Sequence, residues 1–263
     1  MARPALPDVG RKTGRRRMTV RLMSYNIRFG GVGREARLAE VIRKCEPDIV
    51  VLQEATRPEV VERIADLCEM PHWTAKLNHS VAFISRIEAK NYEWHYHPQL
   101  QRAFLEIDIA GARIYGVHLR ATHSNYTERG RMREVRALLD GIKEKSNEFH
   151  VLVGDFNTLA PGELLNLQKL PWRYRVLAML LGGRITYRTI QIMLDAGYVD
   201  SYRRLHTDLG FTFPAWDPNV RLDYLFTPAQ FADRISACDV VNDIKEPAKA
   251  TDHLPLLAEI STQ

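Results

Sequence analysis

The strongest constraint on the fold is an alternation of short apolar runs rich in β-branched residues with stretches of helical spacing. Residues 48–53 read DIVVLQ, which is typical of a buried strand. In contrast, residues 36–44 place Leu38, Val41 and Ile42 on one helical face. A chain that alternates in this way predicts an α/β fold whose sheets are covered by helices.

Several further elements follow from the same patterns. Strands are predicted at 20–27, 48–53, 81–85, 102–109, 113–119, 150–153, 222–226 and 256–260. Ala110 and Gly111 form the predicted turn of a hairpin. Residues 127–145 give the clearest helix, and 161–197 are less regular. With no repeat and no Ser/Gly-rich linker, we expect one domain over 19–263.

The net charge of +5 comes from the N-terminal segment alone, because residues 1–17 contain six basic residues and one acidic residue. We expect 1–18 to be a disordered basic tail or an upstream-start artefact, with binding to a polyanion as the alternative. The basic isoelectric point therefore gives no argument for a nucleic-acid-binding body. Three cysteines without CxxC spacing, no secretory signal and no membrane-length apolar run favour a cytoplasmic protein without structural zinc.

Polar side chains occur where the predicted strands end. Apolar runs lead into Asn26, Glu54 and His118, and the GDFN segment carries two more polar residues. Loops at one end of the strands collect functional groups in α/β sheets. Carboxylates and amides suit a hard cation such as Mg²⁺ or Mn²⁺ better than zinc. The complete set is Asn26, Glu54, His118, Asp155, Asn157, Asp223, Asp252 and His253.

Each of these residues alone also has an ordinary structural explanation. Asn26 could be a turn residue, and Glu54 could be a carboxylate at a helix start. Asp155 could form an Asx turn without any chemistry, and His118 could be a hydrogen-bonded histidine in a strand. Asp223 lies between apolar neighbours and needs a partner, because burying a lone carboxylate is costly.

The order of six segments resembles the endonuclease/exonuclease/phosphatase superfamily, the DNase I-like phosphodiesterases. The segments are SYNIR (24–28), LQEA (52–55), GVHL (116–119), GDFN (154–157), RLDYLF (221–226) and TDH (251–253). Each string is weak alone, whereas all six in order are specific. The resemblance covers about 19–262 and implies a four-layer α/β sandwich, in which two packed mixed sheets lie between helices.

The resemblance also implies the binding groups of the site. Glu54 would be the principal ligand of Mg²⁺, or of Mn²⁺ as a substitute. Asn26 would position the metal or the phosphate, and Asp252 would complete the metal environment. His118 would donate to a phosphate oxygen, and Arg28 would add positive charge beside it.

The implied catalytic residues are His118, Asp155, Asn157, Asp223 and His253. Asp155 and Asn157 would hold and activate the attacking water, and Asn157 would also contact the phosphate. His253, oriented by Asp223, would contact the phosphoryl group or take the proton of the water. Phosphodiester hydrolysis needs such groups, because the water must be aligned and charge on the leaving oxygen stabilised.

The substrate is less constrained than the chemistry. We expect a metal-dependent phosphodiesterase acting on DNA or another nucleic acid. A hydrolase for lipid headgroups, sphingomyelinase-like or phosphoinositide-type, is the first alternative, and a non-catalytic binding protein on the same fold is a remote one. The lysine and glycine typical of the AP-endonuclease branch are absent after Glu54 and Asn26.

One basic and aromatic stretch bears on the choice of substrate. Residues 170–197 interleave arginines with aromatic side chains, which suits nucleobase stacking, an anionic lipid surface or ordinary covering helices. Peripheral membrane contact through this stretch stays open at this point. We expect a monomer.

Overall fold

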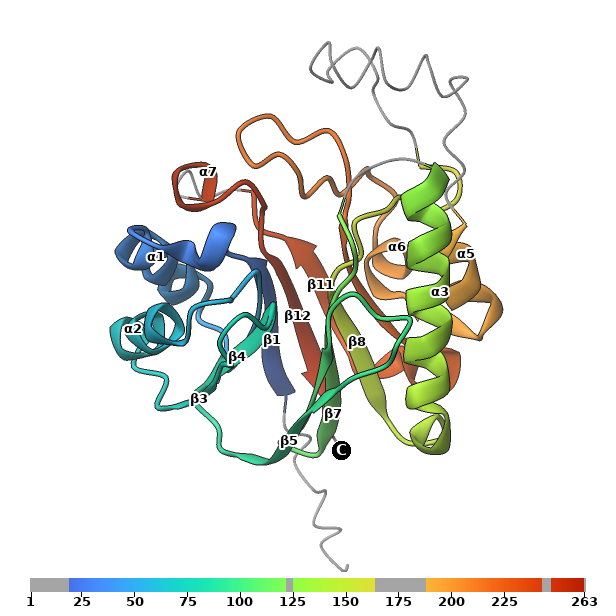
Figure 1. The fold of residues 1–263 in the computed structure, drawn as a ribbon, viewed down its shortest axis with the longest axis horizontal. Helices are drawn as coiled ribbons and strands as arrows, with labels where there is room; N and C mark the ends of the chain where they lie inside the picture. Colours follow the sequence, from blue (N-terminus) through green and yellow to red (C-terminus); the bar gives the residue numbers. More distant parts are fainter. Residues whose placement is uncertain (1–18, 122–124, 164–187, 243–246, 263) are drawn as a thin grey trace, which may run out of the picture.

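The structure is a computed structural model that describes residues 19–121, 125–163, 188–242 and 247–262. Two β-sheets pack face to face, with helices on both outer sides (Figure 1). This is the predicted four-layer α/β sandwich. The predictions for the tail at 1–18, and for most of the stretch at 170–197, fall outside the described residues.

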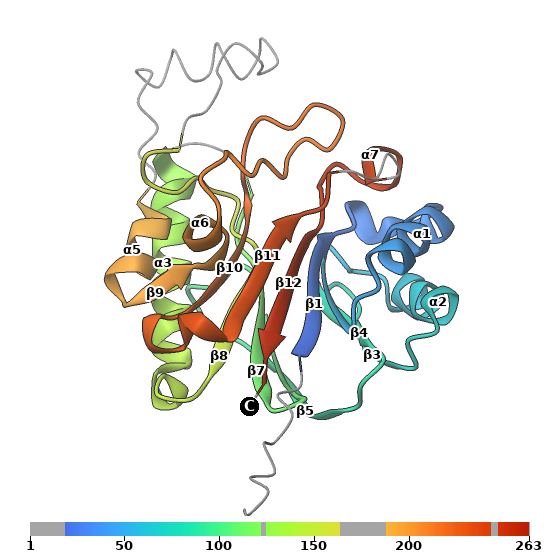
Figure 2. The ribbon, with the colours of Figure 1, turned by 180° about the vertical axis from the view of Figure 1, so that it is seen from behind.

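The first sheet has six strands in the order β11-β12-β1-β2-β4-β3. They are β1 (Thr19–Asn26), β2 (Ile49–Gln53), β3 (His72–Thr74), β4 (Val81–Ser85), β11 (Ile235–Val240) and β12 (Leu256–Ser261). Only β1 and β2 are parallel neighbours in this sheet. Figure 2 shows β12 between β1 and β11. The carboxyl ends of β1 and β2 therefore share one edge.

The second sheet has six strands in the order β5-β6-β7-β8-β10-β9. They are β5 (Ala89–His95), β6 (Phe104–Ile109), β7 (Ala112–His118), β8 (His150–Asp155), β9 (Tyr198–Asp200) and β10 (Asp223–Pro228). Again one central pair, β7 and β8, is parallel, while its neighbours are antiparallel. The predicted hairpin at 110–111 is present between β6 and β7.

The main core fills the space between the sheets. On β1, Val20 and Leu22 join this core, whereas Met23 and Tyr25 face the helices on the other side. The alternation follows from strand geometry, in which successive side chains point to opposite faces. Val153 of β8 and Leu225 of β10 meet the same core from the second sheet.

Two pairs of helices form the outer layers. The helices α1 (Glu35–Cys45) and α2 (Pro58–Cys68) cover the first sheet, and α3 (Asn125–Gly141) with α5 (Thr189–Asp195) covers the second (Figure 1). The predicted face of α1 is buried, and Pro58 begins α2, a position where proline costs no hydrogen bond. The helix predicted at 127–145 ends earlier, at Gly141, and a short 3₁₀ turn, η2 (Lys143–Lys145), follows.

The remaining helical elements are short. They are η1 (Phe29–Gly31), α6 (Ser201–Leu205), η4 (Ala229–Arg234) and α7 (Pro247–Ala250). Among the described residues, no helix combines the length and apolarity needed to cross a membrane.

Candidate active site

The alternation of buried side chains along β1 and β8 determines which polar side chains enter the site. On β1 the core-facing positions Val20 and Leu22 continue through Ser24 to Asn26. On β8 the same alternation runs from Val151 and Val153 to Asp155. By two-residue periodicity, the last side chain of each strand therefore points into the space between the sheets. The amide of Asn26 confirms this, since its Nδ2 donates to Oδ2 of Asp155 at 3.0 Å.

The registers bring the other polar residues to the same edge. In the parallel pair of β7 and β8, His118 lies beside Asp155. In the antiparallel pair of β8 and β10, Asp223 is the partner of Asp155. His253 precedes β12, which runs antiparallel to β1 and therefore starts where β1 ends. At this edge β1 and β2 end and β12 begins in the first sheet, while β7 and β8 end and β10 begins in the second. This arrangement brings together groups from distant parts of the chain.

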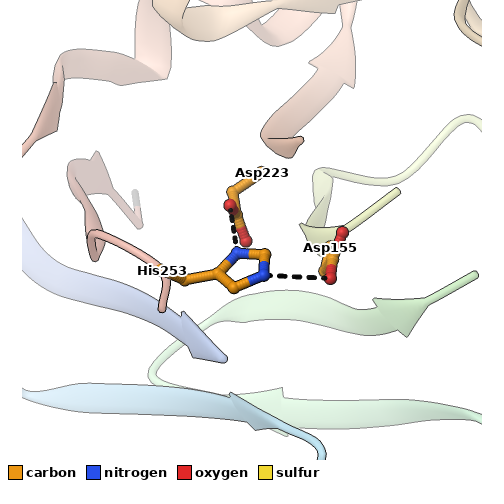
Figure 3. A group of neighbouring side chains, drawn as sticks. All are labelled: Asp155, Asp223 and His253. Carbon is orange, nitrogen blue, oxygen red and sulfur yellow. Dashed lines mark hydrogen bonds and ion pairs between the residues drawn. The ribbon is translucent and has the colours of Figure 1, made fainter. Parts of the chain in front are cut away.

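Three buried groups form the centre of the site (Figure 3). Nδ1 of His253 is 2.9 Å from Oδ2 of Asp223, and its Nε2 is 3.8 Å from Oδ2 of Asp155. One ligand atom from each residue lies within 4.8 Å of the others. The imidazole therefore lies between two carboxylates that come from neighbouring strands of one sheet.

Burial and charge shift the pKa values of this group. Burial lowers the pKa of His253, but the carboxylates of Asp223 and Asp155 outweigh it and raise this pKa to about 10. Burial also raises the pKa of Asp155, to about 7, against the opposing charge of His253. The group therefore holds a proton on the imidazole at neutral pH, and Asp155 is a better base than an exposed aspartate.

His118 lies on the other side of Asp155. Its Nε2 is 3.8 Å from Oδ2 of Asp155, and its Nδ1 contacts the hydroxyl of Ser80. Burial lowers the pKa of His118 well below its usual value, and the charge of Arg102 lowers it further. The imidazole is therefore neutral, and its contact with Asp155 is not an ion pair.

The partners of the two ring nitrogens indicate which nitrogen of His118 carries the proton. The Ser80 hydroxyl accepts the backbone N–H of Glu54 at 3.2 Å, and it contacts Nδ1 of His118. A hydroxyl that accepts from the backbone still has its own proton to donate, and the carboxylate of Asp155 faces Nε2 as an acceptor. Nδ1 of His118 is therefore the acceptor, and the ring proton is on Nε2, toward Asp155.

Glu54 follows β2 in a left-handed backbone conformation, with φ of 57°. This conformation is uncommon for a residue with a side chain and often marks functional sites. Its Oε2 accepts the backbone N–H of Phe29 at 2.6 Å, and its Oε1 lies 3.4 Å from Nδ2 of Asn26. Because the same Nδ2 donates to Asp155, one amide links the two carboxylates across the sheets.

The donor set fits a hard divalent cation. Glu54 and Asp155 contribute carboxylates within reach of a single amide group, and Asp223 adds a third nearby. Carboxylate oxygens with an amide are the ligands that Mg²⁺ and Mn²⁺ prefer. A cation between these groups would also offset the cost of gathering buried negative charge.

Arg28 and Asp252 lie at the rim of this group and bind each other. Nε of Arg28 is 3.2 Å from Oδ2 of Asp252, and the backbone N–H of Arg28 donates to Oδ1 of Asn26. The hydroxyl of Thr251 donates to Oδ1 of Asp252 at 3.3 Å. The structure places Asp252 against an arginine, and its expected role in the metal environment stays a prediction.

The turn after β8 positions Asn157. Oδ1 of Asp155 accepts the backbone N–H of Asn157 at 2.8 Å, which is the Asx turn considered from the sequence. Nδ2 of Asn157 donates to the carbonyl of Leu119 at 3.1 Å, next to His118. The Asx turn is therefore compatible with a catalytic role for Asp155 and Asn157, because both residues still lie at the site.

Comparison with family models identifies the group to which these residues belong. Residues 23–253 match the model described as the endonuclease/exonuclease/phosphatase family. The chain belongs to this family. The match confirms the resemblance carried by the six segments, and it supports a phosphoesterase as the general activity. Comparison with curated proteins gives no significant match.

Solved structures of the endonuclease/exonuclease/phosphatase family share the fold. One is a protein from Beutenbergia cavernae, with a TM-score of 0.71 and 20% identity over 94% of this chain and 72% of that chain. Others are the 3′ phosphatase NExo from Neisseria, bound to a product DNA hairpin, and an AP endonuclease from Archaeoglobus fulgidus. Both have a TM-score of 0.67 and 18% identity, over 92% of this chain and 99% of theirs.

Two contacts of this endonuclease/exonuclease/phosphatase site were missed by sequence reasoning. Ser80 belongs to none of the six segments that resemble the family, although it directly precedes a predicted strand. The structure explains its position, because β4 is antiparallel to β2 and therefore begins where β2 ends. Thr212 was also missed, and its hydroxyl accepts the backbone N–H groups of Leu222 and Asp223 at 3.0 and 3.3 Å. It fixes the start of β10.

Proposed function

We propose that this family member is a divalent-metal-dependent phosphodiesterase that hydrolyses DNA or another nucleic acid by attack of an activated water. The observation that carries this proposal is the buried contact of His253 with Asp223 and Asp155, joined to Glu54 through the amide of Asn26. These groups come from both sheets and meet only at this edge.

The chain's own residues account for the acid–base part of the reaction. His253 donates through Nδ1 to Asp223, so Nε2 of the charged ring is free to donate to a phosphoryl oxygen. Asp155 lies within reach of the same region and accepts the proton of the attacking water, as its raised pKa favours. Asn157 is held beside Asp155 by the turn after β8.

His118 and Asn26 complete the cradle for the phosphate. Neutral His118 presents an Nε2–H donor, and Ser80 contacts the other ring nitrogen. Asn26 links the carboxylates of Glu54 and Asp155 by donating to both. Such preorganised donors stabilise charge that develops on the phosphoryl oxygens. Arg28 would add positive charge at the rim, where it is half-exposed and paired with Asp252.

Glu54 and Asn26, with Asp155 and Asp252 nearby, would hold the metal. A Mg²⁺ bound there would supply Lewis acidity to the phosphoryl group and would make the attacking water easier to deprotonate. Mn²⁺ is the expected substitute, because it prefers the same oxygen ligands.

Nucleic acid is the first substrate to test. Two of the structural neighbours are described by an activity on nucleic acid, one as a 3′ phosphatase bound to a product DNA hairpin and one as an AP endonuclease. At 18% identity they share the fold, and their substrates support a proposal for this chain without deciding it.

A lipid headgroup is the second candidate, and exposed aromatic side chains favour it. Phe29 is 77% exposed and Trp216 is 60% exposed. Both lie next to the rim, since Phe29 follows Arg28 and the N–H of Ala215 donates to the carbonyl of Asp252 at 2.8 Å. Exposed aromatic rings insert at membrane interfaces, but they also stack on nucleobases.

A metal-supplemented substrate screen tests the proposal. Single- and double-stranded DNA, RNA, inositol phosphates and sphingomyelin vesicles would be incubated with Mg²⁺, with Mn²⁺ and with EDTA. The proposal predicts cleavage of a nucleic acid that requires the metal and that falls by about 10² to 10⁴ in His253→Ala. Cleavage of lipid alone would support the second candidate. Metal-independent cleavage, or none, would contradict both.

A further inference from the structure

A cavity adjoins the site on the side of His118. It has a volume of about 200 Å³ and lies between the start of β4 and the segment that precedes β6. Its wall includes Asn78, Ser80, Tyr96, His97, Gln101 and Arg102. Among the described residues that line it, none is acidic, whereas one arginine and two histidines are present. This composition favours an anion, and it contrasts with the carboxylates around His253.

One residue of the wall contacts a proposed catalytic residue directly, and a second shares a backbone acceptor with another. The hydroxyl of Ser80 contacts Nδ1 of His118. Nη1 of Arg102 donates to the carbonyl of Leu119 at 3.0 Å, and the side chain of Asn157 donates to the same carbonyl. The wall of the cavity is therefore connected to His118 through Ser80, and to Asn157 through the carbonyl of Leu119.

The wall offers donors suited to an oxyanion. The bond to Leu119 uses one of the five N–H groups of the Arg102 guanidinium. Nδ1 of His97 accepts the backbone N–H of Gln99 at 3.1 Å, so the neutral ring carries its proton on Nε2. The amides of Asn78 and Gln101 are two further groups that can donate. A guanidinium surrounded by neutral donors is a common arrangement around phosphate.

A further positive charge lies beside the cavity. Nζ of Lys76 donates to the hydroxyl of Tyr96 at 2.9 Å and lies 5.4 Å from the centre of its ring. The Tyr96 hydroxyl is 2.8 Å from Nε2 of His79, whose Nδ1 donates to the carbonyl of Leu77. This chain of contacts holds the ammonium group next to the wall of the cavity.

We propose that this cavity is a second phosphate subsite, which binds a phosphate group of the substrate other than the one that is hydrolysed. The inference rests on the proposed phosphodiesterase function. The volume is several times the roughly 30 Å³ occupied by one water molecule, which leaves room for a phosphate. Because the cavity lies beyond His118, its phosphate belongs to a neighbouring position of a nucleotide chain.

The first test compares four thymidine substrates with the full chain and Mg²⁺. TpT has one phosphate, pTpT and TpTp each add a terminal phosphate, and TpTpT adds an internucleotide phosphate. The subsite predicts that the KM of at least one substrate with a second phosphate is about tenfold below that of TpT, as expected for a charge-assisted contact. Equal KM values for all four would overturn the proposal.

The same series identifies the source of the second phosphate. A low KM for TpTpT assigns the subsite to an internucleotide phosphate. A low KM for pTpT or TpTp, without one for TpTpT, assigns it to a terminal phosphate. Either result supports the subsite, and a difference between pTpT and TpTp says which end of the scissile bond it serves.

Variants connect the effect to the cavity. In Arg102→Gln, the KM ratio between TpT and the preferred substrate should fall to about one, whatever the absolute rate. Arg86→Gln is the matched control, because Arg86 directly follows the opposite end of β4 and bonds the carbonyl of Pro47. If Arg102→Gln is poorly folded by circular dichroism, His97→Ala gives the second test. An unchanged ratio in the folded variants would overturn the proposal.

A binding measurement separates this inference from the proposed function. In EDTA, the carboxylates around His253 repel anions, so inorganic phosphate should bind mainly in the cavity. The wild-type chain should broaden the ³¹P signal, and Arg102→Gln should lower the affinity derived from this broadening about tenfold. This result supports the subsite even if no phosphodiester is cleaved. Cleavage of nucleic acid without any phosphate binding in EDTA would overturn the subsite and leave the proposed function in place.

Discussion

Asp155 is the residue on which the most contacts of the site converge. Its carboxylate accepts from Asn26 and from the backbone of Asn157, and it lies 3.8 Å from a ring nitrogen of both His118 and His253. The two imidazoles differ in charge, because one is paired with Asp223 and the other is buried beside the hydroxyl of Ser80. Two histidines can thus serve different roles within one cluster.

Ser80→Ala tests the role of the hydroxyl. Without it, His118 loses its partner at Nδ1 and can place its proton on either nitrogen. We expect kcat to fall about tenfold, which is less than the roughly 10² to 10³ for removing such a donor, because the imidazole itself remains, and we expect the pH profile of kcat to change in shape. Steady-state kinetics from pH 5 to 9 would measure both.

Ser85→Ala is the matched control, because Ser85 lies at the opposite end of β4 and bonds the carbonyls of Asp48 and Ile87. Its kcat and pH profile should equal those of the wild type. A Ser80→Ala enzyme with wild-type kcat and an unchanged profile would show that the hydroxyl does not position His118.

At the residue scale, sequence reasoning succeeded where a polar residue ended an apolar run. Asn26, His118 and Asp155 keep the parity of the buried positions before them, so their inward direction could be predicted. The pairing of Arg28 with Asp252 could not, because it joins two loops whose conformations are set by contacts far apart in the chain.

At the scale of elements, Gly154 lets β8 lie against β7. Its φ is 147°, a conformation that side chains rarely adopt, and a Cβ there would lie 1.9 Å from the carbonyl oxygen of Val117. The clash is with backbone and cannot be relieved by rotating a side chain. This close approach keeps His118 and Asp155 at the same level of the sheet.

Gly154→Ala should therefore be strongly destabilising, by roughly 3 kcal/mol or more, as expected for strain at a special backbone position. Urea unfolding followed by circular dichroism would measure the change. Gly141→Ala is the control, because a Cβ there makes only ordinary contact with Phe104, and alanine favours the helix α3. Similar stability of the two variants would contradict this account of β7 and β8.

The contact between His150 of β8 and Tyr198 of β9 makes stability depend on pH. Burial lowers the pKa of His150 below its ordinary value of 6.5. The unfolded chain therefore binds the proton more readily, and the contribution of His150 to stability is lost as the pH falls below about 6.5. The free energy of unfolding of the wild type, relative to His150→Gln, should decrease between pH 7.5 and pH 5. A constant difference in denaturant unfolding would show that the proton plays no part.

The elements themselves were predicted to different degrees. Strands with long apolar runs, such as β4 and β12, were predicted to within a residue. β5, with an exposed and polar sequence, and the three-residue strands β3 and β9 were not, because their pairing partners define them rather than their own pattern. The helix α2 was also missed, although Pro58 marks its first turn.

For the whole molecule, the site exists because two sheets end at one edge. Asn26 and Glu54 come from the first sheet, and Asp155 and Asp223 come from the second. The order of six short segments was enough to predict this convergence through resemblance to a family. Composition and periodicity alone predicted only covered sheets, because they do not specify which strands pair.

Glu54→Gln tests whether the first sheet contributes a metal ligand to the site. The substitution keeps the shape of the side chain and removes its charge. We expect the Mg²⁺ concentration for half-maximal activity to rise at least tenfold, since even indirect partners of a metal site cost that much in affinity. Titration of activity with Mg²⁺ would show it, with Glu59→Gln, an exposed residue of α2, as the control. Equal Mg²⁺ requirements would exclude Glu54 as a ligand.

The most direct test of the central claim is the location of Mn²⁺ by anomalous diffraction from a crystal soaked in the ion. The account predicts a dominant peak within about 2.5 Å of a carboxylate oxygen of Glu54, at the edge where Asn26 joins Glu54 to Asp155. A dominant peak elsewhere on the molecule, or no peak at saturating Mn²⁺, would contradict it.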